Sequence, residues 1–151
     1  MQILDIIQND RATPTDAAST ARGLLNQLQM SETYFRCAVA FRLFAITDAF
    51  ATAVQHPTIN IAEVIHRKRE VLNELHSFRG QFDFLFDNAL NEATRLDLDD
   101  MKLPRKKRMP ARYDITGTNF QFDNVRALHH SQFYESVDVL VSTIDMRLDE
   151  Q

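Results

Sequence analysis

Glycine, proline, cysteine and tryptophan are all scarce in this chain of 151 residues, which holds 3 Gly, 4 Pro, 1 Cys and no Trp. Average proteins contain roughly 12% Gly plus Pro, so this chain has too few turn residues for a β-sandwich or a β-barrel. With 44% hydrophobic and 25% charged residues, the composition is that of a globular chain that can bury a core. These shortages predict an all-α fold.

The single cysteine, Cys37, excludes a disulfide within the chain and a zinc site built on several cysteines. It falls in the most apolar stretch, where we expect a small core side chain rather than a reactive thiol. The first ten residues lack the basic-then-apolar pattern of a signal peptide. Arg42 interrupts the apolar stretch around Cys37 to Ile46, whereas a membrane span needs about 20 mostly apolar residues. We therefore expect a soluble intracellular chain with no membrane partner.

Apolar residues recur every three or four positions along most of the chain, which predicts a bundle of four to five helices. Thr13, Ser31 and Asn60 are expected to begin helices as capping residues. The helix from Ser31 to His56 is predicted to be central and the most buried. The stretch 2–8 is too short to assign to a helix or a strand.

Two glycines bear on how these helices end and pack. Gly23 is expensive inside a helix, so it predicts close packing against another helix at that point. Gly80 interrupts the stretch from Ile61 to Leu96, which is either one long bent helix or two helices. The apolar residues keep nearly the same phase on both sides of Gly80, which favours one bent helix.

Beyond Leu96 the helical period is lost until about Val125, where a last helix to Leu148 is predicted. We expect a single helical domain, 1–151, in which 1–97 form a bundle, 98–124 a proline-containing basic linker loop and 125–151 the terminal helix. The terminal helix carries one apolar face: Phe133, Val137, Leu140, Val141, Ile144 and Leu148.

The net charge of −4 is divided unevenly between the predicted loop and the rest of the chain. Six basic residues and no acid lie within residues 102–112, and we call them the basic tract: Lys102, Arg105, Lys106, Lys107, Arg108 and Arg112. Removing these 6 from 17 basic residues leaves 11 against 21 acidic ones, so the rest carries −10. The basic tract predicts contact with nucleic-acid phosphates or nuclear import, and the alternative is a solvated linker beside acidic helices.

No other pattern predicts catalysis or a cofactor. Glu63, His66 and Glu70 share one helical face, but a di-iron bundle needs a second Glu-x-x-His motif, so a surface salt-bridge ladder is expected. His129 and His130 are adjacent and cannot chelate one ion together, which predicts polar residues near a helix start. No glycine-rich phosphate loop is present. We expect no metal, no cofactor and no small-molecule substrate.

The chain resembles the hAT (hobo, Ac, Tam3) superfamily of transposases, especially the transposon-derived proteins of the zinc finger MYM-type group. The likeness spans nearly all 151 residues and is carried by ARGLL, LFAITDAFATAVQ with the following NIAEVI, and FYESVDVLVSTIDMRL. In that family a helical insertion interrupts an RNase H-like domain, and this chain looks like the insertion of such a larger protein.

The resemblance implies a nuclear, non-catalytic helical fragment that contributes DNA contact or protein association. The family's metal-binding acidic residues would lie upstream of Met1 and downstream of Gln151, so neither Glu135 nor Asp145 is assigned a catalytic role. The alternative function is a protein-interaction or dimerisation module with no nucleic-acid role. Its expected surface is the terminal helix from Phe133 to Leu148, which would make the chain a homo-oligomer.

Overall fold

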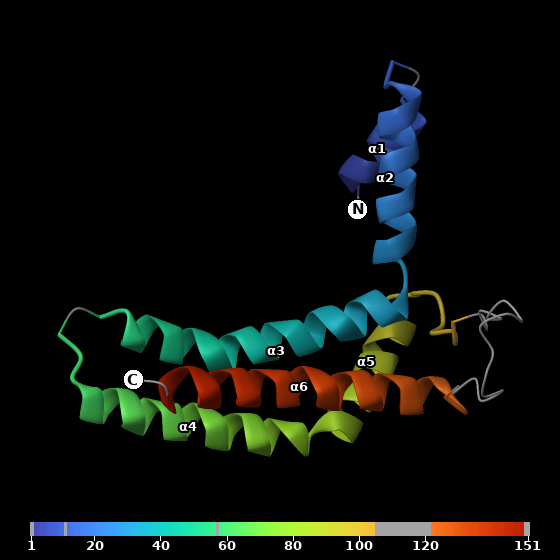
Figure 1. Cartoon of the computed structure of the whole chain (residues 1–151). Coiled ribbons are helices and arrows are strands. Elements are labelled where there is room, and N and C mark those ends of the chain that lie inside the picture. Colours follow the sequence, from blue (N-terminus) through green and yellow to red (C-terminus); the bar gives the residue numbers. More distant parts are fainter. Residues whose placement is uncertain (1, 11, 57, 105–121, 150–151) are drawn as a thin grey trace, which may run out of the picture. The chain divides into compact units, whose positions relative to one another are not determined.

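A computed structural model of the chain describes residues 2–10, 12–56, 58–104 and 122–149. The chain falls into two compact units, Met1–Met101 and Lys102–Gln151. The first unit contains α1 (Gln2–Asn9), α2 (Thr15–Leu28), α3 (Ser31–Val54), α4 (Ile61–Arg79) and α5 (Phe82–Arg95), and the second contains α6 (Val125–Asp149) (Figure 1). The described residues form six helices and no strand, which confirms the all-α prediction with one helix more than expected.

Residues 2–8, too short a stretch to assign from the sequence, are helical and form most of α1. It packs against α2 as a helical hairpin. Thr13 does not cap α2: the helix begins at Thr15, and Pro14 occupies the cap position with an extended ψ of 140°. The Thr13 hydroxyl instead lies 3.3 Å from a carboxylate oxygen of Asp10, in the turn between the two helices. The extended Pro14 backbone therefore moves the helix start beyond the expected cap.

Gly23 does not mark a close approach between helices. A Cβ built on this residue would have no atom within 4 Å outside its own helix turn. The prediction of close packing at Gly23 is wrong for the described part of the chain, because the glycine faces open space.

Gly80 separates two helices, so the prediction of one bent helix is wrong. The N–H groups of Gly80 and Gln81 donate to carbonyl oxygens three residues back, Ser77 (3.2 Å) and Phe78 (2.9 Å). Both residues nevertheless keep helix-like φ values of −76° and −97°. The turn therefore interrupts the regular series of α-helical hydrogen bonds, but the buried side chains before and after it keep the same phase: Val71, Leu75, Phe78, Phe82, Phe86, Ala89 and Ala93.

Aromatic rings form the centre of the core in the first unit. Phe35 of α3 meets Phe82 and Phe86 of α5 edge to face, with ring centroids 6.2 Å and 5.3 Å apart. Such pairs add about 0.5–1.5 kcal/mol to the free energy of burial. Only the first half of α3 is buried, at Ser31, Phe35, Val39 and Leu43. The prediction that this helix is the most buried is wrong, because four of its 24 residues are buried, against four of the 14 residues of α5.

The end of α5 is a Schellman turn with an aspartate in the position usually held by glycine. The N–H of Leu98 donates to the Ala93 carbonyl (3.0 Å), and the N–H of Asp97 donates to that of Thr94 (3.2 Å). Asp97 has a φ of 53°, in the left-handed region. This turn reverses the chain at the end of α5.

The segment after this turn pairs with the start of α3. The Asp99 N–H donates to the Gln29 carbonyl at 2.9 Å, and the Ser31 N–H donates to the Asp99 carbonyl at 3.0 Å. The Ser31 hydroxyl also donates to that carbonyl, at 2.6 Å. Ser31 was expected to cap α3, but Met30 holds the cap position and the buried Ser31 side chain links segments 68 residues apart.

Side chains cap two helices at their starts. The Asn60 side chain accepts a hydrogen bond from the Glu63 N–H at 2.9 Å, which confirms the predicted start of α4. The Asn124 side chain accepts one from the Ala127 N–H at 2.8 Å and caps α6. The predicted terminal helix is therefore confirmed within one residue at its carboxyl end.

Candidate functional site

The basic tract is the predicted nucleic-acid site, and the structure describes one of its six residues. Lys102 is exposed and comes directly after the segment that pairs with the start of α3. The other five lie outside the described residues: Arg105, Lys106, Lys107, Arg108 and Arg112. Lys102 is therefore the member of the tract that the described residues place.

Several basic side chains of the helices are paired with acids on the same helix. Arg36 pairs with Glu32 on α3, and Arg95 pairs with Glu92 on α5 at 2.6 Å. The partners lie one helical turn apart at the surface, where such ion pairs contribute little to stability. The basic tract, by contrast, contains no acid in its own sequence.

Glu70 forms the expected salt-bridge ladder on α4. Its carboxylate lies 3.4 Å from the His66 Nε2 atom and 3.0 Å from an Arg67 guanidinium nitrogen. These side chains are about half exposed. Within the described residues no three His, Cys, Asp or Glu side chains come together as a metal site.

Cys37 is exposed, so the expectation of a core cysteine is wrong. The reason is its position on the helix. At about 100° per residue, Cys37 lies roughly 200° from Phe35, on the side of α3 that faces away from the aromatic core. An apolar neighbourhood in sequence did not imply burial, because α3 carries apolar residues on both sides.

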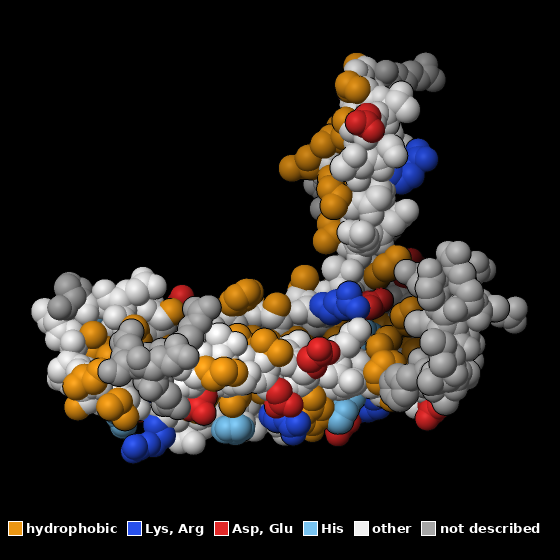
Figure 2. Space-filling view, in the orientation of Figure 1, with side chains coloured by type: hydrophobic (Ala, Val, Ile, Leu, Met, Phe, Trp, Pro, Cys, Tyr) orange, Lys and Arg blue, Asp and Glu red, His pale blue; other side chains and the backbone are white. Residues whose placement is uncertain are grey.

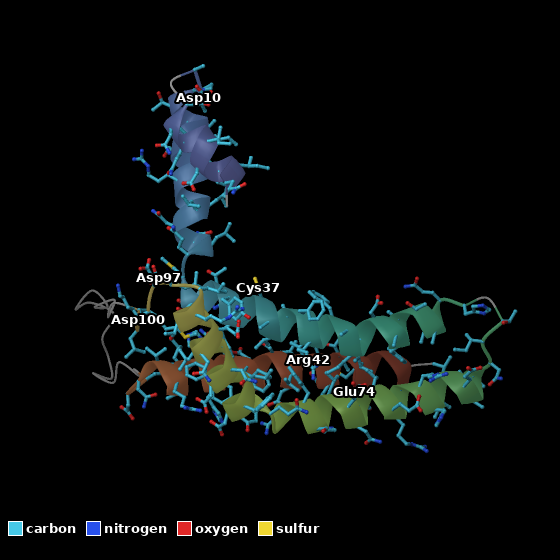
Figure 3. The ribbon with its side chains drawn as sticks, turned by 180° about the vertical axis from the view of Figure 1, so that it is seen from behind. Asp10, Cys37, Arg42, Glu74, Asp97 and Asp100 are labelled. Atoms are coloured by element: carbon cyan, nitrogen blue, oxygen red, sulfur yellow. The ribbon has the colours of Figure 1, made fainter. Side chains whose placement is uncertain are left out.

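The exposed side of α3 forms a continuous stripe, which we call the outer stripe: Cys37, Phe41, Phe44, Asp48 and Ala51. Phe41 is 73% exposed and Phe44 is 71% exposed. An open hollow beside the two rings is lined by α3 residues that include Ala45 and Thr47. Figure 2 shows hydrophobic side chains spread over the described surface, and Figure 3 labels Cys37 on α3. Neighbouring exposed aromatic rings are typical of a protein-interaction surface.

By length and composition α3 could also cross a membrane. Its most apolar window has a mean hydropathy of 1.6, and 17% of that window is buried. A core helix of a soluble protein passes the same test, so this property alone decides little. The expectation of no membrane partner stays a prediction.

Dimerisation through the terminal helix stays a prediction. Phe133 and Val137, at the centre of its predicted face, are 2% and 0% exposed. The exposed large apolar side chains of α6 are Val139 and Met146. His129, expected as a polar residue near the helix start, is buried.

Charged side chains line a cavity of about 260 Å³ between α3 and α4. Arg42 comes from α3 and Glu74 from α4, and both are labelled in Figure 3. Phe78 and Ile46 supply apolar lining. Ser77 and Gln81 add a hydroxyl and an amide to the lining.

Comparison of the chain with protein-family models, with curated proteins and with solved structures gave no match.

Proposed function

We propose that this chain is a non-catalytic helical module of an hAT-type transposase-like protein, and that its basic tract contacts DNA phosphates in the nucleus. The observation that carries the proposal is the separation of charge. Six positive charges lie within residues 102–112, while the remainder of the chain carries −10. A local positive charge of this size attracts a phosphate backbone although the whole chain is acidic.

The experiment measures binding of the purified chain to duplex and single-stranded DNA between about 50 and 200 mM salt. If four to six phosphates are neutralised, duplex affinity should fall on the order of 10² to 10³-fold over this range. Changing Arg105, Lys106, Lys107 and Arg108 to Gln should remove most of the binding and most of its salt dependence.

A matched control removes four positive charges from the helices by changing Arg22, Arg42, Lys68 and Arg69 to Gln. This variant has the same net charge as the tract variant, so it should retain DNA binding to within about threefold if the tract acts locally. Equal losses in the two variants, or no binding by the unchanged chain at low salt, would contradict the proposal.

A second candidate function is protein association without nucleic acid, and the exposed outer stripe favours it. Phe41 and Phe44 place two aromatic rings in solvent on one face of α3. Aromatic side chains of this kind are enriched in the energetically important parts of interfaces. Failure of DNA binding, together with loss of a protein complex on changing these two residues, would favour this candidate.

A further inference from the structure

We propose that two copies of this chain associate through the outer stripe of α3, with their α3 helices antiparallel. The outer stripe lies on the side of α3 opposite its buried residues. At about 100° per residue, the stripe is centred roughly 180° from the line through Phe35, Val39 and Leu43. The stripe therefore points away from the core that α3 shares with α5, and α3 can bind a partner without losing its own packing.

The spacing of the stripe is that of a coiled-coil seam. Successive members are four, three, four and three residues apart, from Cys37 through Phe41, Phe44 and Asp48 to Ala51. This period of about 3.5 residues keeps one row of side chains against a partner helix. The positions directly beside the seam include Ala38, Ala40, Ala45 and Thr47, whose small side chains leave the two phenylalanines free to interlock.

The seam is complementary to a reversed copy of itself. A twofold axis passing between Phe41 and Phe44 places Phe41 of one copy opposite Phe44 of the other. The same axis places Cys37 opposite Asp48, at both ends of the contact. Twofold pairs of this kind are the commonest form of self-association, because one surface then supplies both halves of the interface.

Charge decides the direction of the pair. In a parallel pair Asp48 would face Asp48, and like charges directly opposite each other are destabilising. In the antiparallel pair Asp48 faces the uncharged Cys37 of the other copy. The antiparallel arrangement therefore avoids the repulsion between the two Asp48 carboxylates.

The exposed area predicts a weak dimer. The four phenylalanine rings together contribute roughly 600 Å², and flanking residues must bring the total towards the approximately 1,200 Å² of a stable interface. We therefore expect a dissociation constant of micromolar order. A lipid surface suits the same face less well, because Asp48 lies within the stripe and a charge in a bilayer is costly.

Sedimentation velocity of the full chain, at about 5 to 500 μM, should show a reversible shift from monomer to dimer. The double change Phe41→Gln and Phe44→Gln should weaken dimerisation at least tenfold. Phe84→Gln is the matched control: Phe84 on α5 is 67% exposed and outside the stripe, so its loss should leave the dimer unchanged. Far-ultraviolet circular dichroism checks that each variant keeps its helices.

Cross-linking tests the direction. The Asp48→Cys variant has a thiol opposite the native Cys37 of the other copy, so mild oxidation should give a covalent dimer. Two controls should give little covalent dimer: the unchanged chain, and the variant that combines Asp48→Cys with Cys37→Ser. In each control the thiols of the two copies occupy the same position, and in the antiparallel pair these lie 11 residues, about 16 Å, apart along the helix axis. Efficient cross-linking of the unchanged chain through Cys37 alone would show a parallel pair and overturn the proposal.

A strict monomer at the highest concentration would overturn the proposal, and so would a dimer that survives the double Phe change. Binding of the monomer to vesicles of neutral and anionic lipid through the same phenylalanines would assign the stripe to a membrane instead. None of these outcomes changes the DNA-binding result, because the basic tract and the outer stripe share no residue.

Discussion

Asp97 holds a strained backbone conformation at the end of α5. Its φ of 53° lies in the left-handed region, which costs a non-glycine residue roughly 1 kcal/mol. Aspartate tolerates this region better than most residues, and the hydrogen bonds of Leu98 and Asp97 to α5 hold it there. The turn at Asp97 places Asp99 where it forms hydrogen bonds with Gln29 and Ser31.

Asp97→Gly should therefore raise the free energy of unfolding by about 0.5–1 kcal/mol, and Asp97→Val should lower it by about 1 kcal/mol or more. Urea denaturation followed by circular dichroism measures both. Asp100→Gly is the control, because Asp100 is exposed and its φ is not positive. Stabilisation by glycine at both positions would show that the left-handed conformation is not the cause.

Cys37 illustrates what residue type alone can predict. Free cysteine is usually buried, and its neighbours in sequence are apolar, yet the thiol lies on the exposed side. The angular position relative to Phe35 was available in the sequence. Which side of an apolar helix faces the core was not, because α3 is apolar all round.

At the scale of elements, periodicity predicted the helices well and their ends less well. The caps at Asn60 and the start of α6 follow from residue type and apolar spacing. The sequence located the interruption at Gly80 but favoured one bent helix over two helices, because a short turn with helix-like φ values keeps the apolar phase.

The backbone conformation requires glycine at neither position 23 nor position 80. A Cβ at Gly23 meets nothing within 4 Å, and one at Gly80 lies 3.5 Å from the Ser77 carbonyl oxygen, an ordinary contact. Gly23→Ala should stabilise the chain by about 1 kcal/mol, and Gly80→Ala by about 0.4–1 kcal/mol. Thermal or urea unfolding measures both changes.

The outcome for Gly23 also reports on association. If a partner helix packs closely at this position, Gly23→Ala will destabilise the chain, and the effect will grow with protein concentration. A concentration-independent stabilisation would place Gly23 in solvent, as the structure has it.

At the scale of the whole molecule, a hydrogen bond joins the start of α3 to the segment that follows α5. The Ser31 hydroxyl donates to the Asp99 carbonyl, 68 residues away in sequence, and Ser31 is only 3% exposed. No local pattern could reveal this contact. In the sequence, Ser31 followed by Glu32 resembles a helix cap. The hydrogen bond from the Ser31 hydroxyl to Asp99 depends instead on where α5 ends.

Ser31→Ala should lower the free energy of unfolding by about 1 kcal/mol, the usual contribution of one such hydrogen bond. Hydrogen exchange at the Asp99 amide should become faster because the returning segment is held less firmly. Ser136→Ala is the control, since the Ser136 hydroxyl bonds only within α6 in an exposed position. Equal losses of stability in the two variants would argue against a special role for Ser31.

The all-α class follows from residue types and their spacing, because few turn residues and a period of three to four leave apolar faces that only packed helices can bury. The concentration of positive charge in the basic tract is likewise readable from the chain, since charge is a property of composition. Contacts between segments were needed to establish which side of α3 is buried, where Ser31 makes its hydrogen bond and which aromatic rings stay in solvent. These features depend on contacts between segments far apart in the chain, and such contacts leave no local pattern.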